Sequence, residues 1–89
     1  MGWKVGVSKE AKRFLSENAF AIEEVKTLVG KAIRYFRGES VNIDIRKLKG
    51  AWKGFYRIRR GKIRIIAEFD FANSAVFIER IDWRGGVYK

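Results

Sequence analysis

The chain has 89 residues, so residues 1–89 are expected to form one domain around a single small hydrophobic core. Apolar residues make up 47% of the chain and aromatic residues 15%, which excludes a disordered protein. Cysteine and histidine are absent, which excludes disulfides, thiol nucleophiles, histidine metal sites and a Ser-His-Asp triad. If the protein is an enzyme, its acid–base chemistry must use carboxylates, lysine or tyrosine. No apolar run is long enough to span a bilayer.

The charge is strongly basic and unevenly distributed. Twenty Lys and Arg residues against ten Asp and Glu residues give a net charge of +10. Between Arg46 and Arg64 there are nine basic residues and no acidic one. Such a balance favours a polyanionic partner, either a nucleic acid or an acidic protein. A basic face that only keeps the protein soluble is the alternative explanation.

Local patterns predict a strand and then two helices in the first half of the chain. Alternating apolar residues over 3–7 indicate a short strand. Ser8 is the expected N-cap of a helix that ends near Glu17. Apolar residues at three- and four-residue steps predict a second helix over 21–37, with Gly38 at its C-terminal cap. The two helices are expected to form a hairpin.

The second half of the chain changes to an alternating period. The segment 41–45 is either a short strand or an extended loop, and strands are predicted over 55–60, 63–71 and 75–81. A final short strand would hold residues 87 and 88. The predicted fold class is therefore α+β: an N-terminal strand, a two-helix hairpin and an antiparallel β-meander.

Three arginines are expected to converge on one face of this meander. Because side chains alternate along a strand, Tyr56 and Ile58 can face the core, which leaves Arg57 and Arg59 on the opposite face. Arg64 joins them from the next strand. Like charges on neighbouring strands repel, so a bound polyanion would explain the cluster, and guanidinium groups suit phosphate oxygens. The alternative is a hairpin whose charges only protect an exposed edge.

The last residues form a second candidate cluster. Trp83, Arg84 and Tyr88 could stack on a base and contact its phosphate. Alternatively, the two aromatic residues are peripheral core and Arg84 is an ordinary surface charge. Asp82 is expected to pair with Arg80 and Arg84. The carboxylates show no tight pairing outside a helix start, so no metal site is predicted.

The combined order of motifs resembles the RelE/ParE toxin superfamily over essentially the whole chain. The matching segments are Leu48-Lys49-Gly50, Phe55-Tyr56-Arg57-Ile58-Arg59, Gly61, Arg64-Ile65-Ile66, Ile81 and Arg84-Gly85-Gly86-Val87-Tyr88-Lys89. The resemblance implies a RelE-like, microbial-ribonuclease-type fold and a cytoplasmic toxin of a type II toxin–antitoxin pair. It also implies a cognate antitoxin that is acidic and carries an amphipathic helix, a toxin–antitoxin hetero-oligomer, no membrane partner and no cofactor.

In the RelE branch of this family, the resemblance implies metal-independent cleavage of mRNA in the ribosomal A site, with the ribose 2′-OH attacking the adjacent phosphate. Carried over by position, Arg57 and Arg59 would hold the RNA backbone, Arg64 and Arg84 would clamp the scissile phosphate, and Tyr88 would be the base. The catalytic residues are thus expected to be Arg64, Arg84 and Tyr88. The expected RNA-binding residues are Lys53, Arg57, Arg59, Arg60, Lys62 and Trp83.

The sequence departs from better-known members of the family at three of these expected site positions. Those members have lysines where Arg57 and Arg59 stand, and arginine cannot exchange its proton, so both positions are expected to act electrostatically. Some members have a histidine where this chain has Trp83. A gyrase-inhibiting toxin of the ParE branch and a non-catalytic nucleic-acid-binding module remain the alternative functions. The combination of Arg64, Arg84 and Tyr88 favours RNA cleavage.

Overall fold

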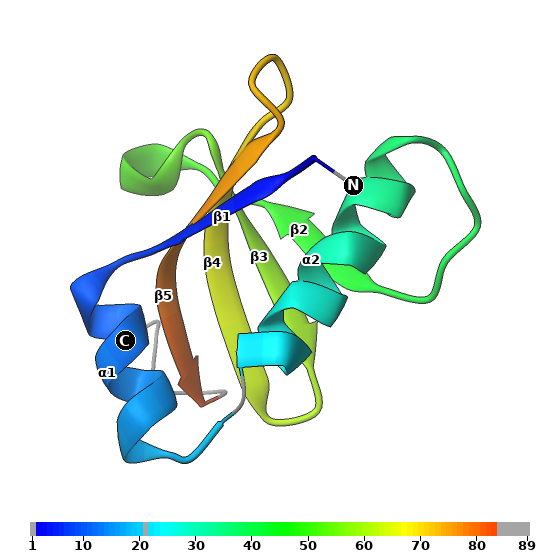
Figure 1. The fold of residues 1–89 in the computed structure, drawn as a ribbon. Helices are drawn as coiled ribbons and strands as arrows, with labels where there is room; N and C mark the ends of the chain where they lie inside the picture. The colour runs from blue at the N-terminus through cyan, green and yellow to red at the C-terminus, as the bar shows by residue number, and fades with distance from the viewer. Residues whose placement is uncertain (1, 21, 84–89) are drawn as a thin grey trace.

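The computed structural model describes residues 2–20 and 22–83, and this part of the chain contains a five-stranded sheet and two α-helices (Figure 1). The elements in chain order are β1 (Lys4–Val7), α1 (Lys9–Glu17), α2 (Ile22–Phe36), β2 (Asp44–Lys47), the 3-10 turn η1 (Gly50–Trp52), β3 (Phe55–Arg60), β4 (Ile63–Asp70) and β5 (Ala75–Trp83). The strand order across the sheet is β1-β5-β4-β3-β2. The predicted α+β class is confirmed, and the predicted strand at 87–88 lies outside the described residues.

The strands from β2 to β5 form the predicted antiparallel meander, and β1 adds to it in parallel. β1 pairs with the first half of β5, with Val5 opposite Val76, and no local pattern in the sequence predicts this pairing. Only the end of the segment 41–45 is a strand: β2 begins at Asp44, pairs with β3 and continues to Lys47, two residues beyond the predicted end, whereas 41–43 form a loop. β4 ends at Asp70, one residue before the predicted end, and β5 continues to Trp83, two residues beyond it.

Ser8 fastens the start of α1 onto β5. Its hydroxyl oxygen accepts a hydrogen bond from the Ala11 N–H at 3.0 Å, as predicted for an N-cap. The same hydroxyl donates to the Glu79 carbonyl oxygen at 2.6 Å, and the Ser8 N–H donates to the Ile78 carbonyl oxygen at 2.9 Å. At this point β5 has one residue more than β4, a β-bulge that interrupts the ladder. Ser8 therefore satisfies a carbonyl that the bulge leaves without its regular partner.

The second helix lays its apolar side on the sheet. Its buried residues are those of the predicted stripe: Val25, Leu28, Val29, Ala32 and Ile33. After Phe36 the helix closes with hydrogen bonds from the Gly38 N–H to the Tyr35 carbonyl and from the Glu39 N–H to the Arg34 carbonyl. This is the glycine cap expected at Gly38. The two helices predicted as a hairpin follow each other along the chain, with α1 packed against β5 and α2 in the core.

The core occupies one face of the sheet. Inward residues of the strands, such as Ile58, Ile65 and Ile78, are fully buried in one cluster with Ala11 of α1 and the stripe of α2. Side chains alternate along a strand, so the intervening residues of β3 and β4 lie on the face that the helices do not cover. We call this second surface the open face. None of the described helices is both long and apolar enough to cross a membrane.

Candidate nucleic-acid interface

The open face brings together the three arginines that the alternation predicts. Arg57 and Arg59 flank the buried Ile58 on β3 and therefore project away from the core. Arg64, between the buried Ile63 and Ile65 on β4, is the direct cross-strand partner of Arg59.

Two of these arginines are largely buried, unlike the side chains of an ordinary basic surface. Arg57 and Arg64 are each only 8% exposed, which corrects the expectation of three freely accessible guanidinium groups. Arg57 Nη2 donates to Asp44 Oδ1 at 3.0 Å, and Arg59 Nε donates to Asp44 Oδ2 at 3.0 Å. One carboxylate thus bridges two arginines, so part of the expected repulsion is offset within the protein itself.

The sequence did not identify Asp44 as a partner of the arginines, because it stands just before the basic run rather than within it. The antiparallel register of β2 and β3 places it directly opposite Arg59. The hydrogen bond from Arg59, together with the charges of Arg59 and Arg57, lowers the pKa of the Asp44 carboxyl below its ordinary value of 3.8. Asp44 is therefore ionised at neutral pH and orients both guanidinium groups.

Cross-strand registers arrange the arginines of this face in two neighbouring rows, beside a further row of Phe55, Glu68 and Phe77. One row consists of Asp44, Arg59, Arg64 and Asp82. The next consists of Arg46, Arg57, Ile66 and Arg80. The first row is balanced and the second is not, so the two rows together have a net charge of +3. An excess of positive charge thus persists on this face after its internal ion pairs are counted.

Three other predicted RNA-binding residues are not direct cross-strand neighbours of these arginines. Arg60 is on the same side of β3 as Ile58 and lines a pocket with Glu24 of α2, so it belongs to the helix-covered side. Lys53 precedes β3 and Lys62 follows it, at opposite ends of a strand about 20 Å long. Arg60 therefore does not join the arginine cluster, and Lys53 and Lys62 flank the strand that carries it.

Trp83 also lies on the helix-covered side. Its ring meets Phe14 of α1 edge-on, with 5.3 Å between centroids, and its Nε1 donates to Asn18 Oδ1 at 3.3 Å. This is the peripheral packing that the sequence left open as an alternative. Trp83 is 44% exposed, but it is separated by the sheet from Arg57 and Arg59. Arg84 and Tyr88 lie outside the described residues.

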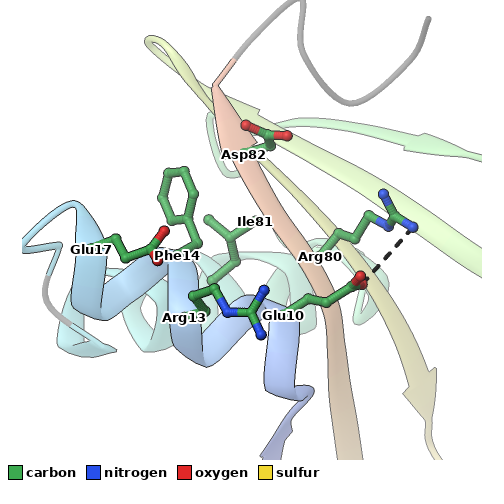
Figure 2. A pocket seen from close by; sticks show the side chains of 7 residues that line it. All are labelled: Glu10, Arg13, Phe14, Glu17, Arg80, Ile81 and Asp82. Carbon is green, nitrogen blue, oxygen red and sulfur yellow. Dashed lines mark ion pairs between the residues drawn. The ribbon is translucent and has the colours of Figure 1, made fainter.

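Arg80 pairs with a carboxylate other than the expected Asp82, and Arg84, the other expected partner of Asp82, lies outside the described residues. Asp82 Oδ1 accepts a hydrogen bond from the Trp83 N–H at 2.7 Å. Arg80 instead reaches from β5 toward Glu10 of α1, with 3.9 Å between Nη2 and Oε1 (Figure 2). These residues line a groove of about 250 Å³ between α1 and β5. The Arg80 guanidinium also lies over the ring of Trp52, 5.6 Å from its centroid.

Solved structures with this arrangement share the fold over nearly their whole length. A chain of the E. coli DinJ–YafQ toxin–antitoxin complex superposes with a TM-score of 0.68 at 13% identity, covering 100% of both chains. A chain of the archaeal RelE–RelB complex from Pyrococcus horikoshii gives 0.63 at 22% identity, covering 98% of this chain and 100% of that one. The fold is RelE-like.

A third structure extends the RelE-like fold to a further bacterium. The metal-bound toxin from Helicobacter pylori superposes with a TM-score of 0.68 at 15% identity and covers 96% of this chain and 98% of that one. No protein-family model and no curated protein matches the sequence. At these identities the RelE-like likeness concerns the fold, and the chemistry must be argued from the residues of this chain.

Proposed function

We propose that this protein is the toxin of a type II toxin–antitoxin pair and that it cleaves mRNA on the ribosome without a metal ion. The RelE-like fold supports the toxin assignment, because the similar chains come from toxin–antitoxin complexes. The arginines of the open face support the chemistry, because cleavage of a phosphodiester concentrates negative charge at one phosphate.

The observation that carries the proposal is the direct pairing of Arg59 with Arg64 beside Arg57. Two like charges opposite each other on neighbouring strands cost stability. Asp44 offsets the charges of Arg57 and Arg59 only in part and holds those two groups in fixed orientations. A phosphate bound here would meet preoriented donors.

The proposed reaction is a transesterification within the RNA. The 2′-oxygen attacks the adjacent phosphorus, its proton passes to Tyr88, and the bond to the 5′-oxygen of the next nucleotide breaks. The products are a 2′,3′-cyclic phosphate and a 5′-OH, the departing 5′-oxygen taking its proton from water. Arg57 and Arg59 bind the backbone, and Arg64 and Arg84 stabilise the charge that develops on the phosphate.

Cleavage of ribosome-bound mRNA with and without excess chelator tests this function. We expect cleavage to survive the chelator and to leave cyclic or 3′-phosphate ends. Arg59→Ala should abolish most cleavage, whereas Arg34→Ala should not, because Arg34 is an exposed arginine of α2 that pairs with Glu39. Loss of activity in chelator, restored by magnesium with 3′-OH products, would overturn the mechanism.

The proposed partner is an antitoxin with acidic groups and an apolar helix face. A chain of net charge +10 suits such a protein. Expression of the toxin alone should arrest growth and translation, and co-expression of an acidic protein encoded beside it should relieve the arrest. If DNA cleavage complexes accumulate while translation continues, the protein is instead a gyrase inhibitor.

A further inference from the structure

Trp52 lies over the open face, away from the hydrophobic core. The partly buried side chains that pack on the core, within the described residues, do not include it. Its turn η1 begins at Gly50 and is followed by Gly54, residues whose φ angles are 66° and 95°. A hydrogen bond from the Lys53 N–H to the Gly50 carbonyl, at 3.1 Å, closes the turn. Because side chains rarely adopt these φ angles, the two glycines build a tight loop that places one aromatic ring over the sheet.

The ring holds a planar cation from a distant strand. Trp52 meets Phe55 edge-on, with 5.4 Å between centroids, and the Arg80 guanidinium lies 5.6 Å from the indole centroid. Arg80 is on β5, two strands away from β3, which follows the loop of Trp52. The second contact of Arg80 is the long, exposed ion pair with Glu10. A cation–π contact or an ion pair at an exposed site each favours the bound position of the side chain by only about two- to fivefold. Arg80 is therefore held only weakly over the ring.

A nucleobase would bind the same indole more strongly. Stacking of a base on an aromatic side chain is worth about 5- to 150-fold in affinity. Arg80 and Arg57 stand in one row of the sheet, separated by Ile66, so their backbones are about 10 Å apart. A base on Trp52 would thus lie beside the phosphate-binding arginines, within reach of a single nucleotide.

We propose that Trp52 is a stacking site for one unpaired base of the bound RNA and that Arg80, displaced from the ring, moves to a neighbouring phosphate. The inference rests on the proposed function, because it takes single-stranded RNA as the ligand. It adds a residue that contacts a base rather than the backbone, and such a contact favours single-stranded RNA that carries bases over a bare sugar–phosphate chain.

Fluorescence of Trp52 tests the proposal without requiring cleavage. In the double variant Trp3→Phe/Trp83→Phe, Trp52 is the only tryptophan. The probes are a short 2′-O-methyl oligoadenylate, whose blocked 2′-oxygen cannot react, and an abasic oligonucleotide with the same number of phosphates. We expect the oligoadenylate to quench the fluorescence saturably and to bind about 5- to 150-fold more tightly than the abasic strand.

Two variants separate stacking from packing. Trp52→Leu should lose the advantage of the base-bearing strand over the abasic one, and Trp52→Phe should retain most of it, with circular dichroism confirming the fold of each. The matched control is Tyr35→Leu, which removes an exposed aromatic residue of α2. This variant should still bind the base-bearing strand more tightly than the abasic one, by the same factor as the parent protein. Equal affinity for both strands in the parent protein, or an undiminished advantage in folded Trp52→Leu, would overturn the stacking site. If the cleavage proposal fails but the stacking site exists, the fluorescence of Trp52 will still be quenched by the oligoadenylate, while ribosome-bound mRNA is not cut.

Discussion

Arg57 donates a hydrogen bond to Asp44 across the β2–β3 pair, with 3.0 Å between Nη2 and Oδ1. Only 9% of the Arg57 side chain is exposed, whereas 47% of the Asp44 side chain is. The cation is therefore the buried partner and the carboxylate is the accessible one. Such a pair fixes a guanidinium group at the surface of a sheet while leaving the face positively charged.

Asp44→Ala should destabilise the protein and strengthen its binding to RNA. Arg57 would lose its carboxylate while remaining buried, which we expect to cost about 1–2 kcal/mol of unfolding free energy, because Asp44 is half exposed. Removal of one negative charge from the open face should tighten RNA binding and steepen its salt dependence. Urea denaturation and affinity measured at several salt concentrations check both effects. A variant that is destabilised yet binds RNA no more tightly would place the RNA away from this face.

The stability of the protein should fall in acid partly through Asp44. Because hydrogen bonding to Arg59 lowers the pKa of this carboxyl in the folded state, its contribution is complete above the ordinary value of 3.8 and is lost as the pH falls through the lowered value. Asp70 contributes with the same sign, because hydrogen bonds from Asn73 lower its pKa. Between about pH 5 and about pH 2, the free energy of unfolding should fall less steeply with decreasing pH for Asp44→Asn than for the parent protein. Denaturation curves recorded across this range measure it. Identical pH dependence in the two proteins would contradict the ion pair.

Tyr88→Phe should keep the fold and ribosome binding but slow single-turnover cleavage by roughly 10²- to 10⁴-fold, the usual contribution of a general base. Free tyrosine has a pKa near 10, so in the proposed reaction the phenolate would need a positive charge beside it. Arg84→Ala should remove activity and also weaken RNA contact, because it removes a charge rather than a base. Rates on pre-bound ribosomes separate the two roles. Near-normal cleavage by Tyr88→Phe would show that another group takes the proton.

Ser8→Ala should destabilise the protein by about 2 kcal/mol, since it removes a helix N-cap and leaves the Glu79 carbonyl at the bulge without its donor. Ser16→Ala is the matched control, because Ser16 is exposed within the same helix and its replacement should change stability by no more than about 0.5 kcal/mol. Thermal or urea unfolding measures both. Equal stability of the two variants would mean that Ser8 acts as an ordinary surface residue.

Most helices and strands of the fold could be predicted from local sequence patterns. The cap at Ser8, the apolar stripe of α2 and the alternation around Ile58 depend on neighbours within a few residues, and each agrees with the structure. The same alternation placed Arg57, Arg59 and Arg64 on one face. It could also have placed Arg60 with Ile58, had the alternation been applied to the end of β3.

The remaining features depend on contacts between distant segments. Asp44 meets Arg59 only because a loop with two glycines sets the register of β2 against β3. Trp52 meets Arg80 only because that loop folds back over the sheet. Trp83 was placed with the arginines by its position beside Arg84 in the sequence, whereas the extension of β5 turns it toward Phe14. Side-chain periods do not encode such long-range geometry.

The parallel pairing of β1 with β5 has a consequence for biosynthesis. Ser8 and its partner Glu79 are 71 residues apart. At about 5–20 residues per second, the ribosome needs about 4–14 s to make the second after the first. Until then β1 has no neighbouring strand, and Val5 and the apolar stripe of α2 lack part of the surface that buries them. A nascent chain interrupted before residue 75 therefore cannot close its sheet, and such a fragment should be a target for proteolysis rather than a working protein.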